Sequence, residues 1–123
     1  MTTILIVEDN PSNMKLLAGI LTRAGYEVLQ ATDADIGIPL ARDKRPSLIF
    51  MDIHMPGTDG VTATRLLKSD PLTASTPIIA VTAHAMQGDR ESILAAGCDE
   101  YIAKPIRYQE VLSTVERILK RKT

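Results

Sequence analysis

The chain has 123 residues, a formal net charge of −1, 45% hydrophobic residues and a single cysteine, Cys98. This length and hydrophobic content suit one domain over residues 1–123, and the lone cysteine excludes an internal disulfide and suits a reducing compartment. The near-neutral charge and the few aromatic residues argue against direct nucleic-acid binding, and because no apolar run approaches the ~20 residues that span a bilayer, we expect a cytoplasmic protein without membrane contact.

The first part of the chain alternates between strand and helix patterns. Residues 4–7 form an apolar run typical of a strand covered on both faces, and the run ends on Glu8 and Asp9. An Asn-Pro pair then predicts a helix start, and apolar residues at helical spacing continue as far as Gly25, which predicts the helix end. A short strand is expected over residues 26–31.

The segment 32–45 is the weakest of the predicted helices. Gly37 and Pro39 both oppose a helix interior, because glycine is too flexible there and proline removes a backbone donor and clashes with the preceding turn. We therefore expect a kinked or shortened helix, closed by Pro46 before the next strand.

The second part of the chain repeats the strand-helix alternation three times. Each strand ends on a polar residue, and the strands with their final residues are 48–51 with Asp52, 78–81 with Thr82, and 101–103 with Lys104. Helices are expected over 61–68, about 89–96 and about 108–120. Five strand-helix units joined by right-handed crossovers predict an α/β, flavodoxin-like (βα)5 fold, with a doubly wound five-stranded parallel sheet in the order 2-1-3-4-5.

The polar residues at the strand ends should meet in one crevice, because the carboxyl ends of parallel strands lie at the same edge of a sheet. They are Glu8, Asp9, Asp52, Thr82 and Lys104. Acids this close repel one another and burial raises their pKa values, a strain that a hard divalent cation such as Mg²⁺, or Mn²⁺ as an alternative, relieves. An ionised Asp52 is then able to accept a phosphoryl group, whose charge would be met by the cation, Lys104 and the Thr82 hydroxyl. Taken alone, Asp52 would more simply cap the turn that follows it.

Four sequence motifs surround these strand ends. They are Ile-Val-Glu8-Asp9-Asn, Met51-Asp52-Ile-His-Met-Pro56-Gly-Thr-Asp-Gly60, Ala80-Val-Thr82-Ala83 and Gly97-Cys-Asp-Glu-Tyr101-Ile-Ala-Lys104-Pro105. Together they resemble the CheY-like response-regulator receiver domain, over the whole chain and with normal spacing. The connection 83–89 is similar to those of stand-alone DivK-type receivers and of receivers attached to hybrid histidine kinases.

The resemblance implies a non-enzymatic switch in two-component phosphorelay signalling, limited to self-phosphorylation from small phosphodonors and autodephosphorylation. Asp52 would be the phosphoacceptor, taking phosphoryl from a histidine kinase or a histidine phosphotransfer protein. Asp9 and Asp52, with the backbone carbonyl of His54, would hold Mg²⁺ directly, and Glu8 would act through water.

Thr82 and Tyr101 would form the switch in this family. The Thr82 hydroxyl moves toward the phosphoryl group, and the Tyr101 ring turns inward into the space that it leaves. The effect would reach a downstream protein effector, or a second copy in a homodimer, through the face made by the fourth helix, the last strand and the last helix. The bond between Lys104 and Pro105 is expected to be cis.

Two histidines each lie two residues beyond a strand end. His54 and His84 are expected to face the crevice, where they would orient or screen the water that hydrolyses the acylphosphate. The simpler alternative is that both are solvated loop residues. The first interpretation predicts that dephosphorylation of Asp52 changes in rate between pH 6 and 8.

Other functions remain open on the sequence alone. The chain could be a receiver fragment of a hybrid histidine kinase, or a receiver fold that binds partners without phosphorylation, although the latter would not need the complete acidic set. A phosphatase-like hydrolase would use Asp52 as its nucleophile on outside substrates, but His54 stands where such enzymes carry a second acid. Flavin binding is disfavoured, because Glu8 and Asp9 would repel a phosphate after the first strand.

Overall fold

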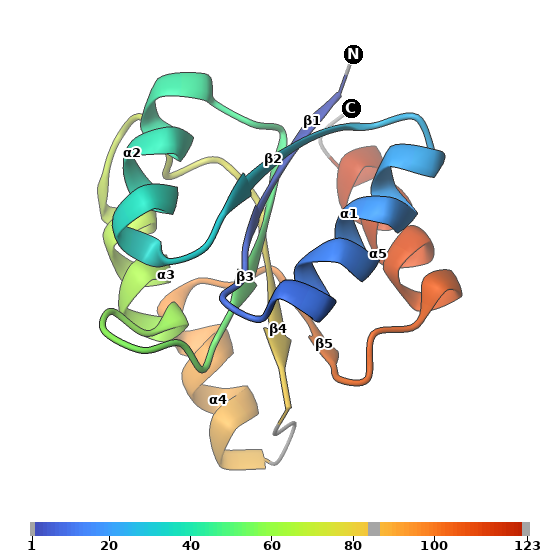
Figure 1. The fold of residues 1–123 in the computed structure, drawn as a ribbon. Coiled ribbons are helices and arrows are strands. Elements are labelled where there is room, and N and C mark those ends of the chain that lie inside the picture. The colour runs from blue at the N-terminus through green and yellow to red at the C-terminus, as the bar shows by residue number, and fades with distance from the viewer. Residues whose placement is uncertain (1, 84–86, 122–123) are drawn as a thin grey trace.

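The computed structural model describes residues 2–83 and 87–121, with only the backbone of residues 87–89. Five parallel strands form one sheet in the order β2-β1-β3-β4-β5, which confirms the predicted flavodoxin-like fold (Figure 1). The strands are β1 (Thr3–Val7), β2 (Glu27–Ala31), β3 (Leu48–Asp52), β4 (Ile78–Thr82) and β5 (Glu100–Ala103). The helices are α1 (Pro11–Arg23), α2 (Ala34–Lys44), α3 (Gly60–Ser69), α4 (Gln87–Ala96) and α5 (Tyr108–Arg121).

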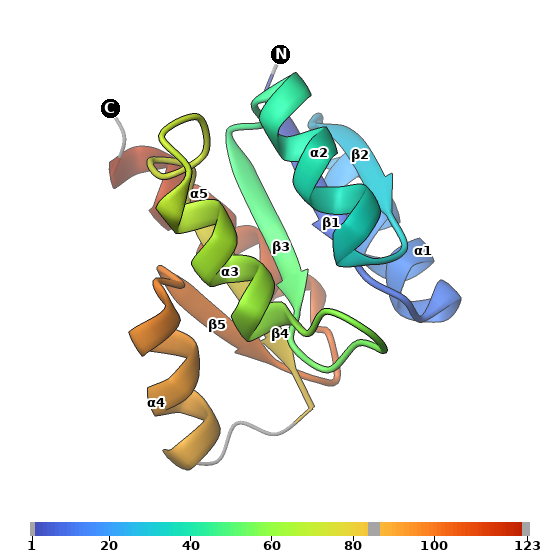
Figure 2. The same cartoon turned by 90° about the vertical axis from the view of Figure 1, so that its left-hand side faces the viewer.

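Helices cover both faces of the sheet. α1 and α5 lie on one face, and α2, α3 and α4 lie on the other (Figures 1 and 2). Because successive strand residues point to opposite faces, the core divides into two clusters. The α1/α5 cluster contains Phe50 and Ile102, and the α2/α3/α4 cluster contains Met51 and Ala80. Every residue of β3 and β4 is buried, as the unbroken apolar runs predict.

Three helices begin at side-chain caps in the loops that follow strands. In each case a side-chain oxygen accepts a hydrogen bond from a backbone N–H three residues later, which satisfies a donor that the helix itself leaves free. The pairs are Asn10 with Asn13 (3.0 Å), Asp33 with Ile36 (2.9 Å) and Asp59 with Thr62 (2.8 Å). These caps fix where α1, α2 and α3 start, and so keep the loops at this edge of the sheet in place.

The second helix differs from its prediction. α2 runs through Pro39 without a break, so the expected shortening does not occur. Ala34, Gly37 and Ala41 are buried on the sheet side of the helix, whereas Pro39 is exposed. A Cβ on Gly37 would lie 2.7 Å from the Val7 Cγ2 atom, so the glycine allows α2 to approach β1 closely. Tertiary packing therefore outweighs the poor helix propensity of this segment.

Within residues 2–83 and 87–121, no helix combines the length and apolar character needed to traverse a bilayer. One predicted site residue, His84, lies outside the described residues.

Candidate functional site

Hydrogen bonds between the strands continue as far as the predicted site residues. Just beyond the strand ends, three backbone N–H groups still donate to a carbonyl of the neighbouring strand. These bonds are Glu8 to Ala31 (3.0 Å), Ile53 to Val81 (3.0 Å) and Lys104 to Thr82 (2.8 Å). The backbone that carries the acids and the lysine is thus tied to the rigid sheet. The peptide bond between Lys104 and Pro105 is cis.

Gly60 holds the loop after Asp52 against the end of β3. Its N–H donates to the Ile53 carbonyl at 2.9 Å, and a Cβ at position 60 would collide with the Asp52 carbonyl oxygen. Only glycine allows this approach, since backbone atoms cannot yield as a flexible side chain would. The sequence predicts a turn over residues 57–60, but it does not show this contact.

Three carboxylates converge at the edge of the sheet. One oxygen from each of Glu8, Asp9 and Asp52 lies within 4.8 Å of the other two. Glu8 and Asp52 are each only 2% exposed, whereas Asp9 is exposed, so the cluster opens toward solvent beside Asp9. The Glu8 carboxylate also accepts a hydrogen bond from the Asn10 backbone N–H at 3.1 Å, which holds it in the crevice.

One ammonium group serves both buried acids. Lys104 Nζ lies 3.4 Å from Glu8 Oε1 and 3.5 Å from Asp52 Oδ1, and its side chain is 21% exposed. Asp52 Oδ1 also accepts a hydrogen bond from the His54 backbone N–H at 3.3 Å. Three carboxylates and one ammonium leave a formal charge of −2 in the crevice, so Lys104 alone does not balance the acids.

The protein environment opposes ionisation of Asp52. Together, the surroundings raise the pKa of Asp52 from 3.8 to about 8. Burial is the largest cause, hydrogen bonds with Glu8 and Asp9 and the charge of Glu8 act in the same direction, and the charge of Lys104 acts against them. A protonated carboxyl is a poor nucleophile. Additional positive charge in the crevice would favour the ionised, nucleophilic form of Asp52.

The donor set fits a hard divalent cation. Carboxylate oxygens are the ligands that Mg²⁺ prefers, and the formal charge of −2 in the crevice would be neutralised by the charge of the ion. The open side beside Asp9 leaves room for the waters that Mg²⁺ retains. Glu8, Asp9 and Asp52 would hold such an ion. The water-mediated role of Glu8 and the ligand role of the His54 carbonyl remain predictions.

Thr82 and Tyr101 share one face of the sheet. Thr82 is fully buried and follows Val81, the register partner of Asp52. Tyr101 pairs with Ala80, and residues two apart on a strand point to the same face, so Thr82 and Tyr101 both lie on the side of α2, α3 and α4. The two residues of the predicted switch are therefore on the same side, while their movement remains a prediction.

Sequence reasoning missed Arg90, which contacts the Tyr101 ring. The Arg90 Cζ atom lies 5.6 Å from the ring centroid, within the range of a cation–π interaction. An exposed arginine early in a helix carries no sequence signal for such a contact, because the contact depends on how α4 packs beside β5.

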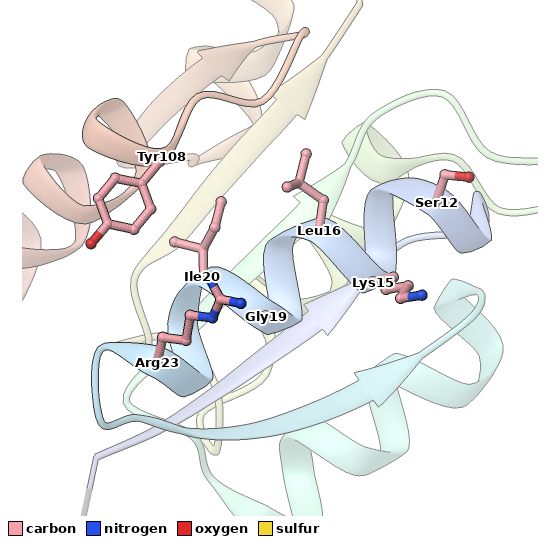
Figure 3. A pocket seen from close by; sticks show the side chains of 7 residues that line it. All are labelled: Ser12, Lys15, Leu16, Gly19, Ile20, Arg23 and Tyr108. Atoms are coloured by element: carbon pink, nitrogen blue, oxygen red, sulfur yellow. The ribbon is translucent and has the colours of Figure 1, made fainter.

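The sequence also gave no sign of a groove between α1 and α5. A cavity of about 530 Å³ lies there, lined by Ser12, Lys15, Leu16, Gly19, Ile20, Arg23 and Tyr108 (Figure 3). Leu16 and Tyr108, which line it, are 46% and 57% exposed. A second cavity of about 400 Å³ is lined by Glu8, Asp9 and again Lys15. Lys15 therefore links the groove to the mouth of the acidic crevice.

Comparisons with known proteins agree with this geometry. A family model described as the response regulator receiver domain matches residues 4–116. The polar-differentiation response regulator DivK of Brucella anthropi is 42% identical over 117 residues, which are 95% of each chain. The receiver domain of the sensor histidine kinase PA1611 of Pseudomonas aeruginosa is 38% identical to this chain, with a TM-score of 0.91, over 97% of this chain and 98% of that one. The crystal structure of that receiver domain has a magnesium ion coordinated in the active-site cleft. The chemotaxis protein CheY4 of Vibrio cholerae is 26% identical with a TM-score of 0.91, over 96% and 98% of the two chains.

Proposed function

The chain belongs to the response-regulator receiver family of two-component signalling, and on that premise we propose that it is a phosphorelay switch phosphorylated on Asp52. Receiver domains of this family interact with histidine kinases or phosphotransfer proteins and with downstream effectors. The observation that carries the proposal is the meeting of the buried Asp52 with Glu8, Asp9 and Lys104 at the end of β3.

Phosphoryl transfer from a phosphohistidine requires little covalent chemistry from the protein. The bond from the donor nitrogen to phosphorus breaks as a bond forms to a carboxylate oxygen of Asp52, and the imidazole that leaves takes up a proton. Catalysis is then mostly positioning and charge stabilisation. Lys104 and the His54 backbone N–H already contact Asp52 Oδ1 and orient the carboxylate, which leaves little conformational freedom to lose.

A divalent cation is part of this proposal. Mg²⁺ at Glu8, Asp9 and Asp52 would supply positive charge that keeps Asp52 ionised and offsets the charge of the phosphoryl oxygens. Lys104 would balance a second phosphoryl oxygen, and the Thr82 hydroxyl a third. The Mg²⁺ reported in the PA1611 receiver supports this choice of ion, with Mn²⁺ as an alternative.

The output of the switch would pass through Thr82 and Tyr101 to the face formed by α4, β5 and α5. A phosphoryl group must favour one state by roughly 3–5 kcal/mol to move a two-state equilibrium almost completely. Charge-assisted hydrogen bonds to Lys104 and Thr82, at about 1.5–3 kcal/mol each, supply an amount of that size. An effector, or a second copy of this chain, would read the change at this face.

The groove between α1 and α5 gives the phosphodonor protein a place to dock. Its exposed apolar residues Leu16 and Tyr108 line the groove together with the basic Lys15 and Arg23, which suits an apolar helix flanked by acidic residues. Because Lys15 also borders the cavity at Glu8 and Asp9, a helix seated there would hold its histidine near Asp52.

His54, exposed beside Asp52, and His84 would modulate dephosphorylation between pH 6 and 8. Residues 1–123 would act as one receiver domain in the cytoplasm, either alone or within a hybrid histidine kinase.

Incubation with Mg²⁺ and acetyl phosphate, followed by intact-mass measurement, tests the proposal. One added phosphoryl group is expected on the wild-type chain and none on Asp52→Ala, while Asp43→Ala, which changes an exposed acid on α2, should be labelled normally. Labelling that persists in Asp52→Ala would refute the assignment. Multiple turnover of an added phosphoester would favour the phosphatase-like alternative instead.

A further inference from the structure

We propose that Arg90 is a positioning residue that holds Tyr101 in its unphosphorylated place and so sets the balance of the switch. This inference rests on the proposed function, because it concerns the ring that is expected to move after Asp52 is phosphorylated. It adds a specific opposing contact, located on α4 and outside the acidic crevice.

The contact joins two elements that are separate in the chain. Arg90 is exposed on α4, and its Cζ atom lies 5.6 Å from the centroid of the Tyr101 ring on β5. The ring is partly buried and packs against the α2/α3/α4 cluster. Figure 2 shows α4 beside β5, on the same face of the sheet as α3. One side of the Tyr101 ring is thus held by the core and another by a cation.

Other arginines near β5 are engaged elsewhere. Arg117 and Arg121, both on α5, lie 3.1 Å and 3.2 Å from carboxylate oxygens of Glu100, the residue before Tyr101. Because α5 covers the opposite face of the sheet from α4, these ion pairs act on the other side of β5. Arg90 is therefore the arginine to change, and Arg117, which contacts the same strand from α5, offers a control.

In this proposal, movement of the Tyr101 ring toward Thr82 would separate the ring from Arg90. A cation–π interaction at a partly exposed site favours the contacted state by about two- to fivefold over the separated one. A residue that stabilises the unphosphorylated arrangement lowers, by thermodynamic linkage, the affinity of ligands that favour the phosphorylated arrangement. The affinity falls by the same factor. Loss of Arg90 should therefore tighten the binding of an acylphosphate mimic at Asp52.

The experiment uses 3-fluorotyrosine labelling and ¹⁹F NMR of the whole chain. The three tyrosines give three resonances, and Tyr101→Phe assigns the relevant one. In Arg90→Gln without ligand, the Tyr101 resonance should move toward its position in wild type saturated with Mg²⁺ and beryllofluoride. The apparent beryllofluoride affinity should rise about two- to fivefold, Arg90→Lys should restore part of the wild-type behaviour, and Arg117→Gln should match wild type.

Two further outcomes make the test decisive. In the Tyr101→Ala background, Arg90→Gln should no longer change the beryllofluoride affinity, because the contact has already gone. An unmoved Tyr101 resonance in Arg90→Gln, or an unchanged or weaker affinity, would overturn the inference. Failure of the proposed function looks different: beryllofluoride and acetyl phosphate would then leave Asp52 unmodified in wild type, whatever Arg90 does to the resonance.

Discussion

The raised pKa of Asp52 predicts that the metal-free protein loses stability as the pH rises, and that Asp52→Asn removes this loss. In the unfolded chain the carboxyl releases its proton near pH 3.8, whereas in the folded crevice it retains the proton until about pH 8. Between these values the folded state binds more protons than the unfolded state, so the free energy of unfolding falls with increasing pH. Below pH 3.8 the group contributes no difference, and above pH 8 the full penalty applies.

The magnitude follows from the same pKa shift. Each pH unit inside the window costs about 1.36 kcal/mol, so wild type should lose at most about 4 kcal/mol more than Asp52→Asn between pH 5 and pH 8. Water that reaches the crevice beside the exposed Asp9 reduces the penalty, and we expect a difference of about 2–4 kcal/mol. Asparagine has nearly the shape of aspartate but cannot ionise, so the variant should be the more stable protein at pH 8.

The assay is urea unfolding in EDTA, followed by circular dichroism at several pH values from 5 to 8. Asp43→Asn is the matched control, because Asp43 is exposed on α2 and forms a long 3.8 Å ion pair with Lys44. Added Mg²⁺ should stabilise wild type more than Asp52→Asn, since a ligand that binds only the folded state adds to its stability. Parallel pH profiles for wild type and Asp52→Asn in EDTA would show that desolvation does not govern this carboxyl.

Three other predictions use different parts of the structure. Lys104→Met removes the ammonium shared by the buried acids, and we expect labelling of Asp52 by acetyl phosphate to slow by about 10- to 100-fold, measured by intact mass over time. Gly60→Ala places a Cβ against the backbone of Asp52 and should destabilise the protein by about 1–3 kcal/mol in urea unfolding, whereas Gly19→Ala, with open space around it, should stabilise it by about 0.5–1 kcal/mol. Equal effects of the two glycine substitutions would contradict the packing argument. Burial raises the pKa of the Cys98 thiol, so it should react with a thiol reagent at neutral pH only after unfolding, and rapid labelling of the native protein would exclude this.

Strand patterns made most of the fold predictable from the sequence. The runs before Asp52 and Thr82 are apolar without alternation, which requires helices on both sides, and the structure buries every residue of β3 and β4. The same logic placed Glu8, Asp52 and Lys104 at one edge, where the structure brings them within salt-bridge distance. In a parallel sheet, every residue that follows the carboxyl end of a strand lies at the same edge. The residues at the strand ends therefore predicted which side chains meet in space.

Contacts between helices and the sheet were not predictable in the same way. The sequence predicted that Gly37 weakens its helix, but the lack of a side chain at this position is what lets α2 lie against Val7. Arg90 gave no signal at all, since its contact with Tyr101 depends on the packing of α4 beside β5. Sequence periodicity reports which side of an element is buried, but it does not report which residue of another element lies opposite.

The position of β5 at the margin of the sheet has a mechanical consequence. β1, β3 and β4 each have a hydrogen-bonded strand on both flanks, whereas β5 pairs with β4 alone. The acids that must keep a fixed geometry are carried by the doubly supported strands β1 and β3. Tyr101 is carried by one of the two edge strands, where a large ring could change its place while the hydrogen bonds between the strands stay intact. On the proposed function, the sheet would combine a stiff centre that carries Asp52 with an edge strand that carries the moving ring.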